Sequence, residues 1–218
     1  MDNKLIEIDK TKREIVIPFE NIQLRGNLVI PQDSKSIVIF SHGSGNSRNS
    51  PRNNYVANLL NNANIATLLV DLLSKEEDQN YDNRFNIDLL TTRLIAVTQF
   101  VCKQAEFNNF SVGYLGTSTG AAAALSAAAV MPDYVDAIVL RSGRPDLATK
   151  ILSIINVPTL LIVGGLDKPI MEKNKKAFSL MKCKKKLIVE PGASHLFEEE
   201  GKLDEVTNYA LRWFLDIL

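Results

Sequence analysis

Residues 110–129 read FSVGYLGTSTGAAAALSAAA, and this stretch indicates how the chain folds around its most reactive candidate side chain. Phe110–Leu115 is a short apolar run typical of a strand, and the small residues from Ala121 onward favour a helix packed closely on a sheet. Between them lies Gly116-Thr117-Ser118-Thr119-Gly120. A serine on a sharp strand-to-helix turn has the geometry of a nucleophile elbow, where flanking glycines relieve crowding. We therefore expect Ser118 to be a nucleophile.

Working outward from the elbow, strands and helices alternate along the chain. Apolar patterning predicts strands at Glu14–Glu20, Ile22–Pro31, Ser36–Ser41, Ile65–Val70, Phe110–Leu115, Tyr134–Leu140, Val157–Val163 and Lys186–Glu190. Helices are expected at Pro51–Ala63 (with Ser50 as N-cap), Ile87–Glu106, the alanine run, Ile170–Met181 and Leu203–Leu218. This order predicts an α/β fold: a three-layer α/β/α sandwich whose mostly parallel eight-stranded sheet starts with an antiparallel hairpin.

Length and composition suit one α/β domain spanning residues 1–218. The chain is 45% apolar, and 25 basic residues balance 25 acidic ones, so we expect neither nucleic acid nor an anionic membrane as a partner. Seven lysines between Lys173 and Lys186 are interpreted as solvated surface, because no aromatic residues interleave them.

Targeting and cysteine signals favour the cytoplasm. The polar N-terminus lacks a signal-peptide core, and no apolar run approaches the ~20 residues that span a bilayer. Cys102 and Cys183 form neither a disulfide framework nor a metal motif. We expect no metal and no organic cofactor.

Three strand ends carry a serine, an aspartate and a histidine in the order Ser118, Asp167, His195. Because ligands bind at the carboxyl ends of parallel strands, we expect these side chains to meet. Histidine, with an ordinary pKa near ~6.5, suits a base that takes the serine proton, and the aspartate would orient it. The rivals are His42, interpreted as a structural loop residue, and Asp146 in the preceding strand-end loop.

A tetrahedral intermediate also needs donors for its oxyanion. We expect the backbone N–H of Thr119, which follows the nucleophile and begins a helix, and that of Ser44 in the loop after His42-Gly43. Arg141 and Arg144 follow a strand end and could bind an anionic substrate group through their guanidinium forks. The alternative is structural ion pairing, for example between Arg144 and Asp146.

The elbow, the His-Gly loop, the order of the three residues and the late Gly-Ala-Ser-His loop together resemble the α/β-hydrolase superfamily, and its dienelactone-hydrolase-like branch in particular. The resemblance covers about residues 15–218. Ser50–Asn53, Asp82–Phe85 and Gly143–Asp146 also resemble a subgroup of uncharacterised hydrolases in that branch. The dienelactone hydrolases proper use a cysteine nucleophile, so Ser118 argues against dienelactone as the substrate.

The expected activity is that of a carboxylesterase-type serine hydrolase acting on a small or medium soluble acyl substrate. Only residues 141–156 separate two strands where many relatives insert a helical cap, so we predict no cap domain. The polar loop Ser74–Arg84 does not resemble a lipid-binding lid. Thioesterase, acyltransferase or peptidase activity, or a non-catalytic binding protein of this fold, remain alternatives, and the oligomeric state stays open.

Overall fold

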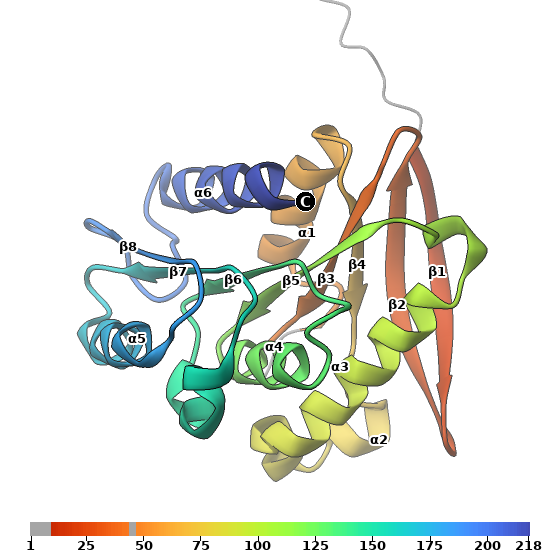
Figure 1. The fold of residues 1–218 in the computed structure, drawn as a ribbon, viewed down its shortest axis with the longest axis horizontal. Helices are drawn as coiled ribbons and strands as arrows, with labels where there is room; N and C mark the ends of the chain where they lie inside the picture. The colour runs from red at the N-terminus through yellow and green to blue at the C-terminus, as the bar shows by residue number, and fades with distance from the viewer. Residues whose placement is uncertain (1–9, 44–46) are drawn as a thin grey trace, which may run out of the picture.

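The computed structural model describes residues 10–43 and 47–218, which build one eight-stranded sheet in the order β1-β2-β4-β3-β5-β6-β7-β8 (Figure 1). The strands are β1 (Lys10–Phe19), β2 (Ile22–Pro31), β3 (Ser36–Ser41), β4 (Ala66–Val70), β5 (Ser111–Thr117), β6 (Ala137–Arg141), β7 (Thr159–Gly164) and β8 (Lys185–Glu190). The helices are α1 (Pro51–Asn62), α2 (Lys75–Asp78), α3 (Ile87–Cys102), α4 (Thr119–Val130), α5 (Lys168–Leu180) and α6 (Lys202–Ile217). Short 3-10 helices are η1 (Tyr81–Phe85), η2 (Ala105–Phe107) and η3 (Pro145–Ile154).

The expected architecture is confirmed. Strands β1 and β2 form the predicted antiparallel hairpin, β2 joins β4 antiparallel, and every later pairing is parallel. Strands β3 and β4 are buried at every position, which explains their uninterrupted apolar runs. Between β6 and β7 the structure has only η3, in keeping with the predicted lack of a cap domain.

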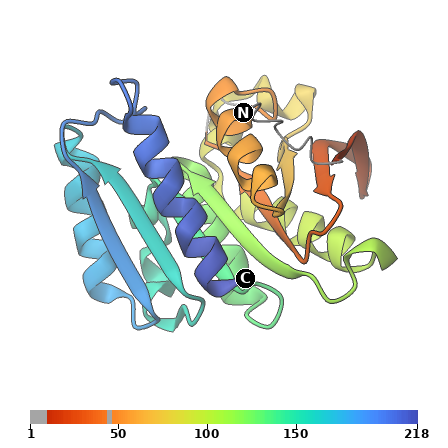
Figure 2. The same ribbon diagram turned by 90° about the horizontal axis from the view of Figure 1, so that it is seen from above.

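Helices cover both faces of the sheet. On one face α3, α4, α5 and η3 bury a large apolar cluster, while α1 and α6 bury a second cluster on the other face (Figures 1 and 2). Helix α4 packs through its alanines, from Ala121 to Ala124, which are fully buried. Trp213 and Phe214 lie in the second cluster.

Two local predictions were wrong in detail. The helix expected to reach Glu106 ends at Cys102, because the chain turns through η2 to bury Phe107 against Phe110 in an edge-to-face contact with ring centroids 5.4 Å apart. The segment expected as a loop at Ser74–Arg84 contains α2 and most of η1. Helix α2 begins with a capping box between Ser74 and Glu77.

The carboxyl ends of the parallel strands meet at one edge of the sheet. Register pairs Ser41 with Gly116, and Thr117 with Arg141. The residues that follow β3, β5, β6, β7 and β8 therefore share this edge, where the sequence placed its chemistry. Within the described ranges no helix is long and apolar enough to cross a membrane.

Candidate active site

Ser118 lies on a strained turn between β5 and α4. Its φ is 48° and its ψ is −124°, a left-handed conformation that side-chain-bearing residues rarely adopt. Close backbone approach requires both flanking glycines: a Cβ on Gly116 would lie 2.7 Å from the Cα of Ala121, and one on Gly120 would overlap the carbonyl oxygen of Ser41. Strain of this kind concentrates at functional sites, and the turn has the predicted elbow geometry.

Asp167 and His195 come together from the ends of β7 and β8. The Oδ2 atom of Asp167 lies 2.5 Å from the Nδ1 atom of His195. The Asp167 side chain is 13% exposed and that of His195 is 40% exposed, so the carboxylate is shielded while the imidazole reaches solvent. With Nδ1 engaged, Nε2 is the ring nitrogen left to accept a proton.

The segment Ser142–Arg144 links the nucleophile turn to the histidine loop. The backbone N–H of Arg144 donates to the carbonyl oxygen of Ser118 at 2.9 Å, and the Ser142 hydroxyl donates to the carbonyl oxygen of His195 at 2.8 Å. The structure therefore gathers Ser118, Asp167 and His195 at one edge of the sheet. Sequence reasoning missed Ser142, because only the strand register shows which loop its hydroxyl reaches.

The rival histidine pairs with a different carboxylate. The Nε2 atom of His42 lies 3.3 Å from Oδ1 of Asp71, and Asp71 also accepts a 2.7 Å hydrogen bond from the backbone N–H of Arg48. Burial pushes the pKa of Asp71 up, but the His42 and Arg48 hydrogen bonds and their charges outweigh it and hold that pKa below its usual value. His42 therefore braces the start of its loop against the end of β4.

The rival aspartate is occupied as well. Asp146 accepts two 2.8 Å hydrogen bonds from Arg144 and lies 3.5 Å from the Nζ atom of Lys173. Burial by itself would raise the pKa of Asp146, but the Arg144 hydrogen bond and the charges of Arg144 and Lys173 have the larger effect. The pKa of Asp146 therefore lies below its usual value. Asp146 contacts these cations, whereas Asp167 contacts the histidine.

Of the two expected oxyanion donors, Thr119 lies in the described part of the chain. Thr119 is buried and begins α4, so its N–H belongs to the first turn of that helix. Ser44 lies outside the described residues. The N–H of Gly43 donates to the Thr117 hydroxyl at 3.1 Å, which ties the end of the loop's described part to the end of β5. Thr117 was not singled out from the sequence.

The structure separates the two candidate arginines. The guanidinium of Arg144 is engaged by Asp146, and this hydrogen bond raises its pKa. Arg141 has no carboxylate partner in the described part of the chain: its Nη2 donates to the Asn53 side chain at 2.7 Å, and its buried Nη1 has no hydrogen-bond partner there. Burial, and then the charge of Arg52, lower the pKa of Arg141 to about 10, so it stays a cation at neutral pH.

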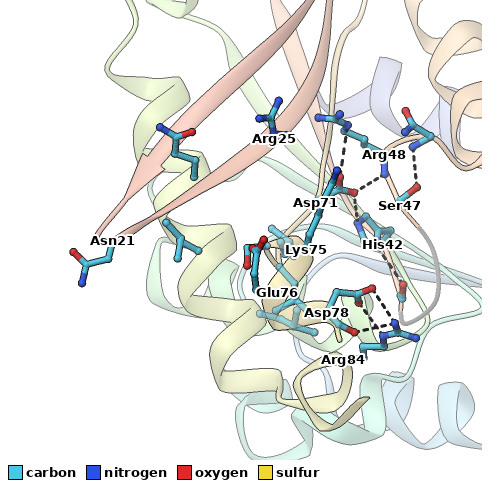
Figure 3. A pocket seen from close by; sticks show the side chains of 18 residues that line it. Asn21, Arg25, His42, Ser47, Arg48, Asp71, Lys75, Glu76, Asp78 and Arg84 are labelled. Atoms are coloured by element: carbon cyan, nitrogen blue, oxygen red, sulfur yellow. Dashed lines mark hydrogen bonds and ion pairs between the residues drawn. The ribbon is translucent and has the colours of Figure 1, made fainter. Parts of the chain in front are cut away.

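A cavity of about 730 Å³ lies beside the elbow, between the β1–β2 hairpin, the α2–η1 segment and the loop after β3 (Figure 3). Its wall is mixed in charge and contains Arg25, Lys75 and Asp78. Neither Ser118 nor His195 belongs to this wall. Gly43 does, and a Cβ placed on it would press against the Ser118 side chain, with Oγ 3.2 Å away. Gly43 therefore belongs to the cavity wall and lies against the Ser118 side chain.

Within residues 10–43 and 47–218, no cluster of three or more His, Cys, Asp or Glu side chains is arranged to hold a metal ion. Cys102 and Cys183 are both free thiols. Burial raises the pKa of each thiol, which leaves both poorly suited to act as nucleophiles.

The chain matches one family model and two proteins of known sequence. The model of the dienelactone hydrolase family matches residues 24–213. A protein from Mycobacterium tuberculosis (strain CDC 1551 / Oshkosh), named "Putative phosphoribosyl transferase", is 48% identical over 205 residues, which is 94% of this chain and 46% of that protein. The chain thus spans about half the length of the curated relatives it matches.

Solved structures repeat the architecture. A dienelactone hydrolase from Anabaena variabilis superposes with a TM-score of 0.93 at 45% identity, covering 96% of this chain and 99% of its own. Est1E from Butyrivibrio proteoclasticus has a TM-score of 0.81 at 18% identity, covering 93% of this chain and 98% of its own. The second likeness is one of fold.

Proposed function

The chain belongs to the dienelactone hydrolase family, and on that premise we propose that it is a serine hydrolase cleaving small or medium soluble carboxylic esters through an acyl-enzyme. The observation that carries the proposal is the 2.5 Å contact between Asp167 and His195, at the same sheet edge as Ser118 on its strained turn. Nucleophile, base and orienting carboxylate are the three groups that acyl transfer to water requires.

The reaction begins at the Ser118 hydroxyl. As Oγ bonds to the acyl carbon, its proton passes to Nε2 of His195, and Asp167 stabilises the resulting imidazolium. The oxyanion would be held by the backbone N–H groups of Thr119 and Ser44. His195 then protonates the departing alcohol, and the ester C–O bond breaks to leave an acyl-serine.

Water completes the cycle. His195 takes one proton from a water molecule whose oxygen attacks the acyl carbon, and a second tetrahedral intermediate forms. Its collapse breaks the bond to Ser118 Oγ, returns the proton to the serine and releases a carboxylic acid. The net change is ester plus water to acid plus alcohol, and His195 carries every proton that moves.

Substrate size is inferred from the cavity beside Gly43. Its volume of about 730 Å³ falls within the ~300–1,000 Å³ of small-molecule sites, and its wall combines charged side chains with apolar ones such as Leu72 and Leu90. Such a wall favours polar, soluble acyl or alcohol groups over long aliphatic chains. Neither candidate arginine lines this cavity, but Arg141 is the one without a carboxylate partner in the described residues, so we expect it rather than Arg144 to meet an anionic substrate group.

Other activities share parts of this machinery. Thioester cleavage, acyl transfer and peptide cleavage pass through the same acyl-serine, so the proposed residues serve them equally. A binding protein of the same fold would need no reactive serine. The transferase name of the mycobacterial relative belongs to a protein of which this chain matches 46%, and it supports no assignment here.

A fluorophosphonate probe followed by a substrate panel tests the proposal. The folded protein should be labelled at Ser118, whereas Ser118→Ala should stay unlabelled. Ser126 lies two turns further along α4 and offers a matched control, so Ser126→Ala should be labelled as the wild type is. Absent labelling of the folded wild type would refute a serine hydrolase, and a panel of esters, thioesters and lactones would rank the substrate classes.

A further inference from the structure

The segment Ser142–Arg144 follows β6 and holds both halves of the proposed site by their main chains. Arg144 N–H donates to the carbonyl oxygen of Ser118, and the Ser142 hydroxyl donates to that of His195. A third bond anchors the segment from outside, because the buried Asn174 side chain on α5 donates to the Gly143 carbonyl at 3.0 Å. The proposed chemistry uses none of these three side chains.

Ser142 shares a positive φ with the nucleophile. Thr117, the last residue of β5, pairs with Arg141, the last residue of β6. Ser118 and Ser142 therefore follow the ends of two neighbouring strands. Both have positive φ, 48° for Ser118 and 44° for Ser142. A serine held in a left-handed conformation where glycine would be unstrained indicates that its side chain is needed there.

The contacts of Ser142 explain that need. Its side chain is buried, its N–H donates to the carbonyl oxygen of Ile162 on β7 at 2.8 Å, and its hydroxyl reaches across to the histidine loop. Strand β7 leads to Asp167, which contacts the imidazole of the same histidine. The backbone and side chain of Ser142 thus tie the ends of β6 and β7 to His195.

We propose that Ser142 is a positioning residue for His195, a role that depends on the proposed hydrolase function. Its hydroxyl fixes the His195 main chain so that the imidazole keeps its contact with Asp167 while Nε2 faces Ser118. At the other end of the segment Ser142–Arg144, the N–H of Arg144 holds the Ser118 main chain, and the Arg144 side chain is paired with Asp146. The Gly-Arg-Pro-Asp motif at 143–146 thus supports the segment that connects the main chains of Ser118 and His195.

Two substitutions at one position separate positioning from stability. Ser142→Ala removes the hydroxyl and keeps the strained backbone, whereas Ser142→Gly removes the hydroxyl and relieves the strain, so the glycine variant should melt at the higher temperature. If the hydroxyl positions His195, both variants lose about 10- to 100-fold in kcat with KM nearly unchanged, despite their different stability. A purely structural residue would instead give activity that follows stability.

Thr159→Val is the matched control. In the wild type, the Thr159 hydroxyl also donates to a main-chain carbonyl, that of Val157 at 2.9 Å, but at the opposite end of β7 from Asp167. This variant should lose stability and keep the wild-type kcat. Hydrogen–deuterium exchange gives a readout independent of activity. The backbone amides of residues 193–197 should exchange faster than in the wild type in both Ser142 variants, and at the wild-type rate in Thr159→Val.

The outcomes separate the two proposals. If the folded wild type is not labelled by a fluorophosphonate, the proposed function fails. If the wild type is labelled and either Ser142 variant reacts at the wild-type rate, the positioning role is overturned. Unchanged exchange at 193–197 in both variants would also overturn it.

Discussion

A methyl group at Gly43 probes the link between the cavity and the elbow. In Gly43→Ala the new Cβ would lie 2.9 Å from the Thr117 carbonyl oxygen and 3.2 Å from Ser118 Oγ, and closer still to Ser118 Cβ. Carbon contacts are most favourable at about 3.5–4.0 Å, so either the loop or the nucleophile has to shift by about 1 Å. A misplacement of that size costs on the order of 100-fold in rate, which corresponds to about 2.7 kcal/mol of transition-state stabilisation.

Gly26→Ala supplies the comparison, because it also introduces a contact shorter than 3.0 Å, but one that involves no residue of the elbow. A Cβ on Gly26 would lie 2.7 Å from the Leu68 side chain and 3.4 Å from the Leu69 carbonyl oxygen. Overpacking costs about 1–3 kcal/mol of stability in either variant. We expect kcat/KM and the rate of fluorophosphonate labelling, each per folded molecule, to fall about 100-fold in Gly43→Ala and to stay near wild type in Gly26→Ala. Equal rates in both variants would refute the reasoning.

Three further predictions concern the charged groups. Asp167→Asn should reduce kcat by about 10⁴-fold while the fold persists, because the asparagine amide no longer stabilises the imidazolium. Asp146→Asn is the control and should retain most activity. Equal losses of kcat in the two variants would contradict the different roles of these carboxylates. Arg141→Met should lower kcat/KM for a carboxylate-bearing ester more than for its neutral analogue, whereas Arg144→Met should not discriminate; a wild-type ratio in Arg141→Met would exclude an anion-binding role. Asp71→Asn should destabilise the protein at pH 7: the folded pKa of Asp71 is depressed, so its contribution is present above about pH 4 and disappears as the pH falls through the folded value. Urea unfolding at several pH values should show the two proteins converging in acid, and a constant difference would contradict this.

Much of the fold was predictable because the signals are local. The continuous apolar runs of β3 and β4 reflect burial on both faces, and the alanines after Gly120 reflect a helix pressed against the sheet. Predictions failed where tertiary packing overrode the local pattern. Helix α3 stops at Cys102 because Phe107 turns inward. Ser50 is the N-cap of α1 as predicted, although its side chain makes no capping hydrogen bond.

Some features of the proposed site were likewise predictable from the sequence, and others required the structure. Residue types and chain order were enough to select Ser118, Asp167 and His195, and the structure brings the last two into contact. The two arginines could not be separated from the sequence, since Arg141 and Arg144 lie at similar positions after one strand. Their difference depends on Asp146 closing back on Arg144 and on Asn53 reaching Arg141 from α1.

The sequence by itself determined the order of strands and helices and the chemical groups at each strand end, because hydrophobic periodicity and turn chemistry are encoded in neighbouring residues. The tertiary structure alone decided that His42 pairs with Asp71, that Gly43 lies against Ser118, and that the Ser142 hydroxyl reaches the His195 loop. Those contacts join residues between 29 and 75 positions apart in the chain (42 to 71, 43 to 118, 142 to 195). They exist only once the parallel strands have paired in register, because each contact joins the ends of strands that are distant in the chain.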